Sequence, residues 1–218
     1  MTRSFRVAVA WLLAAEACYA VMRVTARLSA TASTLPWAEI AAVRFLGGSL
    51  VPLLSARVRR VPLRVADARN AWLRSLFGTG GALSLFYALA IFRVRRLSAH
   101  ESSEAIGFHM SLTAGVIRLL IALPNLEGIP REAIVPLCAS ALAGGVGQTI
   151  VARAYAREAA SRLAAFNYAG VVFTYLLEAA LFRRIPEPHQ IAGALIVIGA
   201  GVAVSVTAAR SVGAGPLE

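Results

Sequence analysis

Long uninterrupted apolar runs constrain the fold of this chain more than any other feature. A helix rises about 1.5 Å per residue, so roughly 20 apolar residues cover the hydrocarbon core of a membrane. Seven runs approach that length, at 7–22, 37–55, 71–92, 105–124, 133–152, 163–182 and 191–209. None alternates apolar and polar residues as barrel strands do. We therefore expect an all-α fold, a polytopic bundle of transmembrane helices.

The composition supports a lipid environment. Hydrophobic residues make up 58% of the 218 residues and charged residues 15%, whereas soluble domains carry about 45–50% and 25%. A globule of this size could not bury so much apolar surface. Arg3 and Arg6 precede the first run, which alone could be a cleavable signal peptide. Because further runs follow, a retained first span is the better interpretation.

The basic residues indicate membrane orientation rather than nucleic-acid binding. All 22 are arginines, which excludes a lysine-containing phosphate loop and a lysine Schiff base. They form short clusters between the apolar runs, so no nucleic-acid partner is expected. Cys18 and Cys138 lie within apolar runs, without the spacing of a disulfide framework or a zinc site. We expect both to be small buried hydrophobic residues and predict no metal site and no cofactor.

The arginine positions conflict with seven simple crossings. If every run crosses once, eleven arginines lie on the cytoplasmic side and nine outside. If 71–92 makes no net crossing, fifteen lie inside and five outside. The positive-inside rule favours the second arrangement. The loops on both sides of 71–92 are therefore predicted to lie in the cytoplasm.

Several motifs within the runs form a pattern. They are Trp11 and Glu16 in the first run, Arg44-Phe45 in the second, GTGGALSLFYALA at 78–90, Gln148 followed by Arg153-Ala154-Tyr155, Phe166 with Tyr168, and IAGALIVIGAG at 191–201. This pattern resembles the drug/metabolite transporter superfamily, specifically its EamA-type permeases. The resemblance covers about 7–92 and 97–209, nearly the whole chain.

The resemblance implies a domain organisation. The family fold is two inverted repeats of five helices, and about three central helices have no counterpart here. The implied divisions are a truncated N-terminal repeat at 1–92, a cytoplasmic linker at 93–104, a C-terminal repeat of four helices at 105–210, and a tail at 211–218. The missing helices would explain the conflict in the arginine count.

Polar side chains inside the runs are the candidates for a substrate pathway, because polar groups in lipid are costly without partners or water. Asn167, Thr174 and Glu178 share one helical face, which fits either a cavity lining or interhelical hydrogen bonds. Glu16 could hold a proton or pair with Arg44, and the Arg44 guanidinium suits a carboxylate of the substrate or of the protein. The predicted substrate-binding residues are Glu16, Arg44, Tyr87, Gln148, Tyr155, Asn167, Tyr168 and Thr174.

Two further features are interpreted structurally. Ala141, Gly145 and Thr149 form a ridge of small residues, which favours close helix packing. His109 lies near the start of its run, where an interfacial position is more usual than a titrating one.

Two functions stay open at this point. No serine-hydrolase, zinc-protease or paired-carboxylate motif is present, so we expect neither an enzyme nor catalytic residues. The resemblance implies a permease in a bacterial inner membrane that exports small polar metabolites, such as amino acids, by alternating access. The alternative is a non-transporting membrane protein, either an internally deleted remnant or a subunit that oligomerises with itself. The expected partners are the lipid bilayer, a small-molecule substrate and, in the oligomeric case, a second copy.

Overall fold

The computed structural model describes residues 3–64, 102–126, 128–158, 160–183, 187–196 and 198–199, and these contain helices and no strands. The elements are α1 (Arg3–Ala32), α2 (Trp37–Arg59), α6 (Ser103–Ala122), the 3-10 turn η1 (Leu123–Asn125), α7 (Arg131–Arg157), α8 (Ala160–Asn167) and α9 (Ala169–Phe182). Residues 188–196 are also helical. The expected all-α bundle is confirmed.

Five stretches of the described chain are long and apolar enough to cross a membrane. They are α1, α2, α6, α7 and Ala165–Phe182. They correspond to five of the predicted runs, although 163–182 is divided by a turn at Tyr168. The run at 71–92 lies outside the described residues, and so does most of 191–209. The protein is therefore an integral, multi-pass membrane protein.

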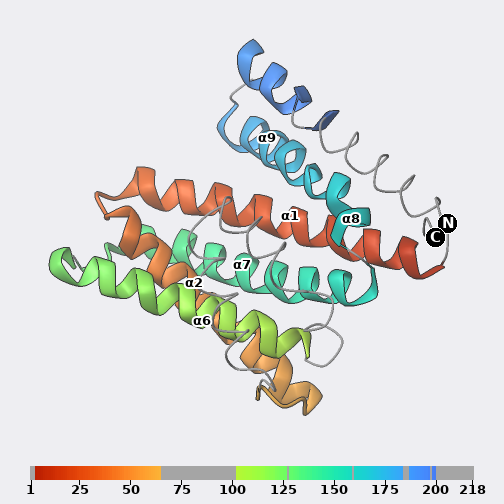
Figure 1. The fold of residues 1–218 in the computed structure, drawn as a ribbon. Helices are drawn as coiled ribbons and strands as arrows, with labels where there is room; N and C mark the ends of the chain where they lie inside the picture. The colour runs from red at the N-terminus through yellow and green to blue at the C-terminus, as the bar shows by residue number, and fades with distance from the viewer. Residues whose placement is uncertain are drawn as a thin grey trace, which may run out of the picture.

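The helices form two groups that both pack against α7: α1 with α9 on one side, and α2 with α6 on the other. In Figure 1, α1 lies between α7 and α9, while α2 packs against both α6 and α7. One apolar cluster joins Phe5, Ala8 and Leu12 of α1 to Ala154 and Leu163. A second cluster, near the other end of α1, joins Leu35 and Ile40 to Ala133 and Leu137 of α7.

Small residues bring α2 and α7 into close contact. A Cβ atom added at Gly48 would lie 3.1 Å from the Ala141 carbonyl oxygen, and one added at Gly47 would lie 2.9 Å from the Ala141 side chain. Thr149 donates its hydroxyl to the Gly145 carbonyl, at 3.0 Å, so its polar group is satisfied within α7. The packing role expected of Ala141, Gly145 and Thr149 is confirmed. Without hydrophobic attraction between helices in lipid, such close backbone contact is a main source of association.

The outward surfaces are apolar, as a lipid-facing bundle requires. Leu50 and Leu54 on α2, Val135 and Leu142 on α7 and Leu176 on α9 are all exposed. Cys138 is exposed as well and Cys18 is half-buried, so the expectation that both are buried was wrong. The cause is that α7 turns Cys138 away from its partners α1 and α2, and an apolar thiol costs little against lipid.

The described stretches on either side of residues 65–101 meet at one end of the bundle. Arg59, at the end of α2, donates to the Glu104 carboxylate in the first turn of α6 at 2.6 Å. Ser102 donates to the Pro62 carbonyl at 3.3 Å, and the His109 ring nitrogen lies 3.1 Å from the Leu63 carbonyl oxygen. The end of α2 and the start of α6 therefore share a side of the membrane, as the second arginine arrangement requires.

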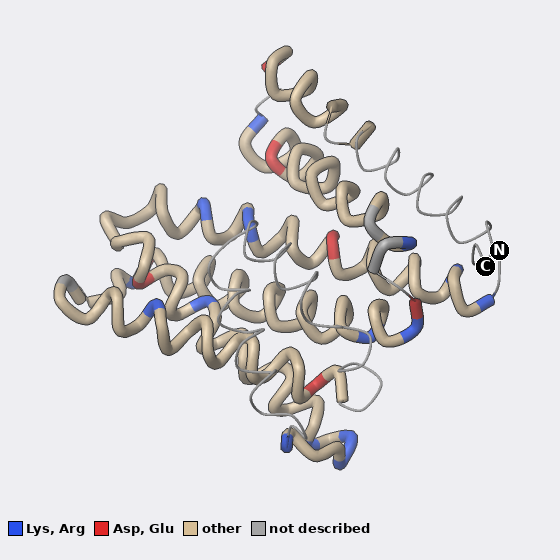
Figure 2. The backbone as a smooth tube through the Cα atoms, in the orientation of Figure 1, with Lys and Arg blue, Asp and Glu red and all other residues tan. Residues whose placement is uncertain are grey.

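Most described arginines gather at this same end, where α1 begins and α2 and α7 finish (Figure 2). They are Arg3, Arg6, Arg57, Arg59, Arg60, Arg64, Arg153, Arg157 and Arg162. The opposite end carries Arg131 and Arg183, with Arg27 in the last two turns of α1. The positive-inside rule therefore predicts that the arginine-rich end faces the cytoplasm.

This orientation predicts a labelling pattern. With Cys18 and Cys138 replaced by alanine, single cysteines at Arg64 and within 93–104 should react with a membrane-impermeant maleimide only from the cytoplasmic side. A cysteine at Gly128 should react only from the other side. Labelling of intact cells and of inverted vesicles measures both. Opposite sidedness of Arg64 and 93–104 would contradict the topology.

Candidate functional site

Four helices surround a small cavity halfway along the bundle. It has a volume of about 80 Å³, room for a few waters or a carboxyl group, since water occupies about 30 Å³ in the liquid. Its lining residues come from α1, α2, α6 and α7, and are Tyr19, Met22, Arg44, Phe45, Gly48, Ser111, Gly144, Gly145 and Gln148. All of them lie in the central parts of their helices, so the cavity lies about midway along the four spans.

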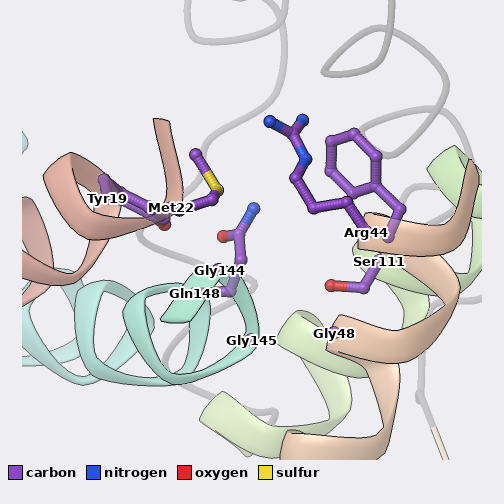
Figure 3. Close-up of a pocket in the computed structure, with 9 residues that line it drawn as sticks. Tyr19, Met22, Arg44, Gly48, Ser111, Gly144, Gly145 and Gln148 are labelled. Carbon is purple, nitrogen blue, oxygen red and sulfur yellow. The ribbon is translucent and has the colours of Figure 1, made fainter. Parts of the chain in front are cut away.

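Polar side chains project into this cavity from two sides. In Figure 3, Arg44 extends from α2 and Gln148 extends from α7 toward the same space, beside Met22 of α1. The Ser111 hydroxyl of α6 lies below them, and Ser111 is buried. An amide, a hydroxyl and a guanidinium together offer several donors and two acceptors to a polar solute.

Glycines make the space for the cavity. A Cβ added at Gly144 would lie 2.9 Å from the Met22 sulfur, and one added at Gly145 would collide with the Gly48 carbonyl oxygen. A Cβ added at Gly147 would lie 2.8 Å from the Tyr19 ring. The α7 backbone therefore approaches both α1 and α2 here, and larger residues would close the space between them.

Arg44 lies on the ring of Phe45, and so does a second arginine. The Arg44 guanidinium carbon is 4.4 Å from the ring centroid, and that of Arg118 on α6 is 5.1 Å from it. The Nε atoms of both arginines are buried, and no described residue accepts a hydrogen bond from them. Within the described chain neither guanidinium pairs with a carboxylate. The ion pair expected between Glu16 and Arg44 is therefore absent.

Glu16 instead faces the seam between α1 and α9. Its carboxylate lies 3.8 Å from the Arg23 guanidinium, and Glu16 is 5% exposed. The carboxylate occupies the place where a side chain at Gly170 would stand, so a larger residue there would require the Glu16 side chain to move. Arg23 also donates to the Gly170 carbonyl at 3.2 Å and to the Thr174 hydroxyl at 3.1 Å.

The polar stripe predicted on 163–182 contacts several partners. Glu178 accepts from Arg27 of α1 at 2.7 Å, one helical turn beyond Thr174. Asn167 ends α8 and accepts from the Tyr155 hydroxyl at 3.1 Å. Tyr168 forms the turn between α8 and α9. These contacts hold α8 and α9 against α7 and α1, which is the interhelical alternative for this stripe.

The structure thus brings together two of the predicted site residues, Arg44 and Gln148, at the cavity. Glu16 and Thr174 share Arg23 as a neighbour in the α1–α9 seam, and Tyr155 contacts Asn167 near the arginine-rich end. Tyr87 lies outside the described residues. The sequence reasoning did not include Ser111, Met22 or Phe45 among the site residues. For Phe45 the signal was present, since it directly follows Arg44, and for Ser111 it was a lone hydroxyl in an apolar run.

A buried ion cluster lies at the arginine-rich end of the bundle. The Glu104 carboxylate is 3% exposed and accepts from Arg59 at 2.6 Å and from Arg153 at 2.7 Å. Ser55 donates to the same oxygen at 3.2 Å. Glu104 therefore links the start of α6 to the last turns of α2 and α7, between the cavity and the arginine-rich end of the bundle.

The described residues contain no group of three or more His, Cys, Asp and Glu side chains that could hold a metal ion. What the cavity offers is hydrogen bonding and positive charge. This chemistry suits binding and release of a polar solute.

Comparison with known proteins places the chain among membrane transporters. Residues 81–207 match the model of the EamA-like transporter family. Over 142 residues the chain is 28% identical to the pseudopaline exporters CntI of two Pseudomonas aeruginosa strains, covering 61% of this chain and 48% of each exporter. The chain spans about half the length of these curated relatives, and no solved structure matches it. Because the family model covers more than half of the chain and the described fold is a bundle of membrane-spanning helices, the chain belongs to the EamA-like transporter family.

Proposed function

We propose that this chain moves small polar metabolites, such as amino acids or related compounds, outward across the inner membrane of a bacterium. The observation that carries the proposal is a cavity, lined in part by Arg44, Gln148 and Ser111, at the middle of a bundle that belongs to a transporter family. Both matched relatives are named exporters, which supports the outward direction.

The mechanism proposed is alternating access. Solute sites of secondary transporters lie near the midplane, where helices from two halves meet. Here α1 and α7 line one side of the cavity and α2 and α6 the other, so that each side combines a helix from before residues 65–101 with one from after them (Figure 3). The Glu104 cluster lies between the cavity and the cytoplasm, so α2, α6 and α7 would have to separate there for a solute to enter from inside.

A flux assay tests this function directly. The full chain is reconstituted into liposomes loaded with a panel of radiolabelled acidic, neutral and basic amino acids. Efflux of at least one of them should exceed by about tenfold the leak from liposomes without protein. Chain inactivated by heat before reconstitution is the control. Efflux equal to the leak for every member of the panel would contradict the proposal.

The oligomeric alternative is supported by α9. Only 6% of the span Ala165–Phe182 is buried, and its Val172, Leu176 and Leu181 are exposed. Lipid or a second copy of the chain could cover this face. Crosslinking in native membranes distinguishes the two, since a recovery of monomers alone removes the oligomeric alternative.

A further inference from the structure

The arginines inside the bundle fall into two groups. Arg23 and Arg27 lie near the carboxylates of Glu16 and Glu178, and Arg59 and Arg153 share the carboxylate of Glu104. Arg44 and Arg118 have no carboxylate neighbour within the described chain. Both nonetheless lie within spans, where an unpaired charge is costly and functional by default.

The surroundings of these two arginines fix the positions of the guanidinium groups but supply no negative charge to them. Each guanidinium lies against the Phe45 ring, at 4.4 Å for Arg44 and 5.1 Å for Arg118. A cation over an aromatic face is attracted by about 0.5–2 kcal/mol, which is far less than burial of the charge costs. Within the part of the chain that the structure describes, their Nε–H groups are buried donors without an acceptor.

The missing partner is therefore an anion. We propose that the solute carries a carboxylate, which binds Arg44 in the cavity while Arg118, whose guanidinium also lies near the Phe45 ring, supplies a second positive charge. A guanidinium matches a carboxylate in a two-pronged hydrogen bond, and such charge-assisted bonds are about twice as strong as neutral ones. Gln148 and Ser111 then bind the polar remainder of the solute.

This inference rests on the proposed function for its biological meaning, but binding is measured separately from flux. The probe is radiolabelled succinate, bound at equilibrium to the purified full chain in mild detergent. Succinamide, which has the same shape without the charge, serves as the neutral competitor. Succinate should bind, and succinamide should compete at least about tenfold less well.

Variants locate the binding. Arg44→Gln and Arg118→Gln should each raise the Kd for succinate by about tenfold or more, since one charge-assisted hydrogen bond contributes about 1.5–3 kcal/mol. The matched control is Arg162→Gln, because Arg162 also lies on a phenylalanine ring, 5.1 Å from the Phe5 centroid, but pairs with Glu158 at 3.1 Å. It should change the Kd less than about twofold.

Loss of folding is excluded by a conservative change. Arg44→Lys keeps the positive charge and should bind succinate more weakly than wild type but more tightly than Arg44→Gln. If Arg44→Lys and Arg44→Gln bind succinate as tightly as wild type, the site is elsewhere and the proposal is overturned.

A lipid phosphate is the other source of an anion. Nanodiscs of phosphatidylcholine with and without phosphatidylglycerol separate the two sources. A solute site predicts the same succinate Kd in both. No succinate binding, together with stabilisation by phosphatidylglycerol that Arg44→Gln abolishes, would assign the arginines to a headgroup and overturn the solute assignment. Efflux of a polar solute that lacks a carboxylate, such as an amino acid amide, without succinate binding would overturn this inference alone, whereas succinate binding without any flux would overturn the transport function alone.

Discussion

Glu104→Ala is expected to lower the free energy of unfolding by about 3 kcal/mol, the lower end of the range for removing one partner of a buried ion pair. The Glu104 carboxylate is 3% exposed and accepts from Arg59 and Arg153 at 2.6 and 2.7 Å. Most of this loss comes from Arg153, because its side chain is only 24% exposed and its charge would be left partly buried without a partner. The Arg59 side chain is 53% exposed, so water can solvate its charge after the carboxylate is removed. Denaturation by sodium dodecyl sulfate in mixed micelles, followed by circular dichroism, measures the change.

The control for Glu104→Ala is the same substitution at a glutamate that also has a basic neighbour but is exposed. Glu187 is 70% exposed and lies 3.3 Å from His189, so Glu187→Ala should change stability by less than about 0.5 kcal/mol. Combining Glu104→Ala with Arg153→Ala should show a coupling energy of at least about 1 kcal/mol. Coupling near zero would mean that the two side chains do not depend on each other in the folded protein.

The helices and their orientation were the most predictable part of the structure. Lipid requires a minimum apolar length, so the run at 37–55 matched α2 (Trp37–Arg59) closely. The arginine count also anticipated that the end of α2 and the start of α6 lie on the same side. The Arg59–Glu104 contact shows this directly, over a stretch of sequence where apolar length alone predicted a crossing.

Helix breaks were less predictable. The run at 163–182 is apolar throughout, yet α8 ends at Asn167 and α9 starts at Ala169. Tyr168 makes no side-chain capping hydrogen bond there, so no capping motif marks the break. What accompanies it is tertiary: Asn167 accepts from Tyr155 of α7, and Gly170 lies against Glu16 of α1.

The partners of the charged side chains were hard to predict, because they depend on which helices are neighbours. Glu16 and Arg23 are seven residues apart, about two turns along α1, and therefore share one face of that helix, which is a local signal that they have common neighbours. The predicted pair of Glu16 with Arg44 overlooked this signal. The cavity itself needs α6 beside α2 and α7 beside both α1 and α2, and no local pattern specifies these neighbours. Gln148 was anticipated by its family motif, whereas Ser111 became meaningful only once α6 was placed.

The contact between α2 and α7 gives the second large effect. Gly145→Ala is expected to lower the free energy of unfolding by about 2 kcal/mol, within the usual range for overpacking. The added carbon would collide with the Gly48 carbonyl oxygen and lie 2.8 Å from the Val51 side chain. A backbone carbonyl cannot rotate away as a flexible side chain can, so α2 and α7 must separate. The same denaturation assay measures the loss.

Gly193→Ala is the matched control for Gly145→Ala, because Gly193 lies in the helical stretch 188–196 and a Cβ there meets nothing within 4 Å. It should leave stability unchanged or slightly higher, since alanine favours the helix by up to about 1 kcal/mol over glycine. Separation of α2 from α7 also moves Arg44 away from Gln148, so Gly145→Ala should weaken succinate binding while Gly193→Ala should not. If Gly145→Ala were as stable as Gly193→Ala, the two backbones would not be in contact, and the cavity between them would lack the walls that α2 and α7 provide.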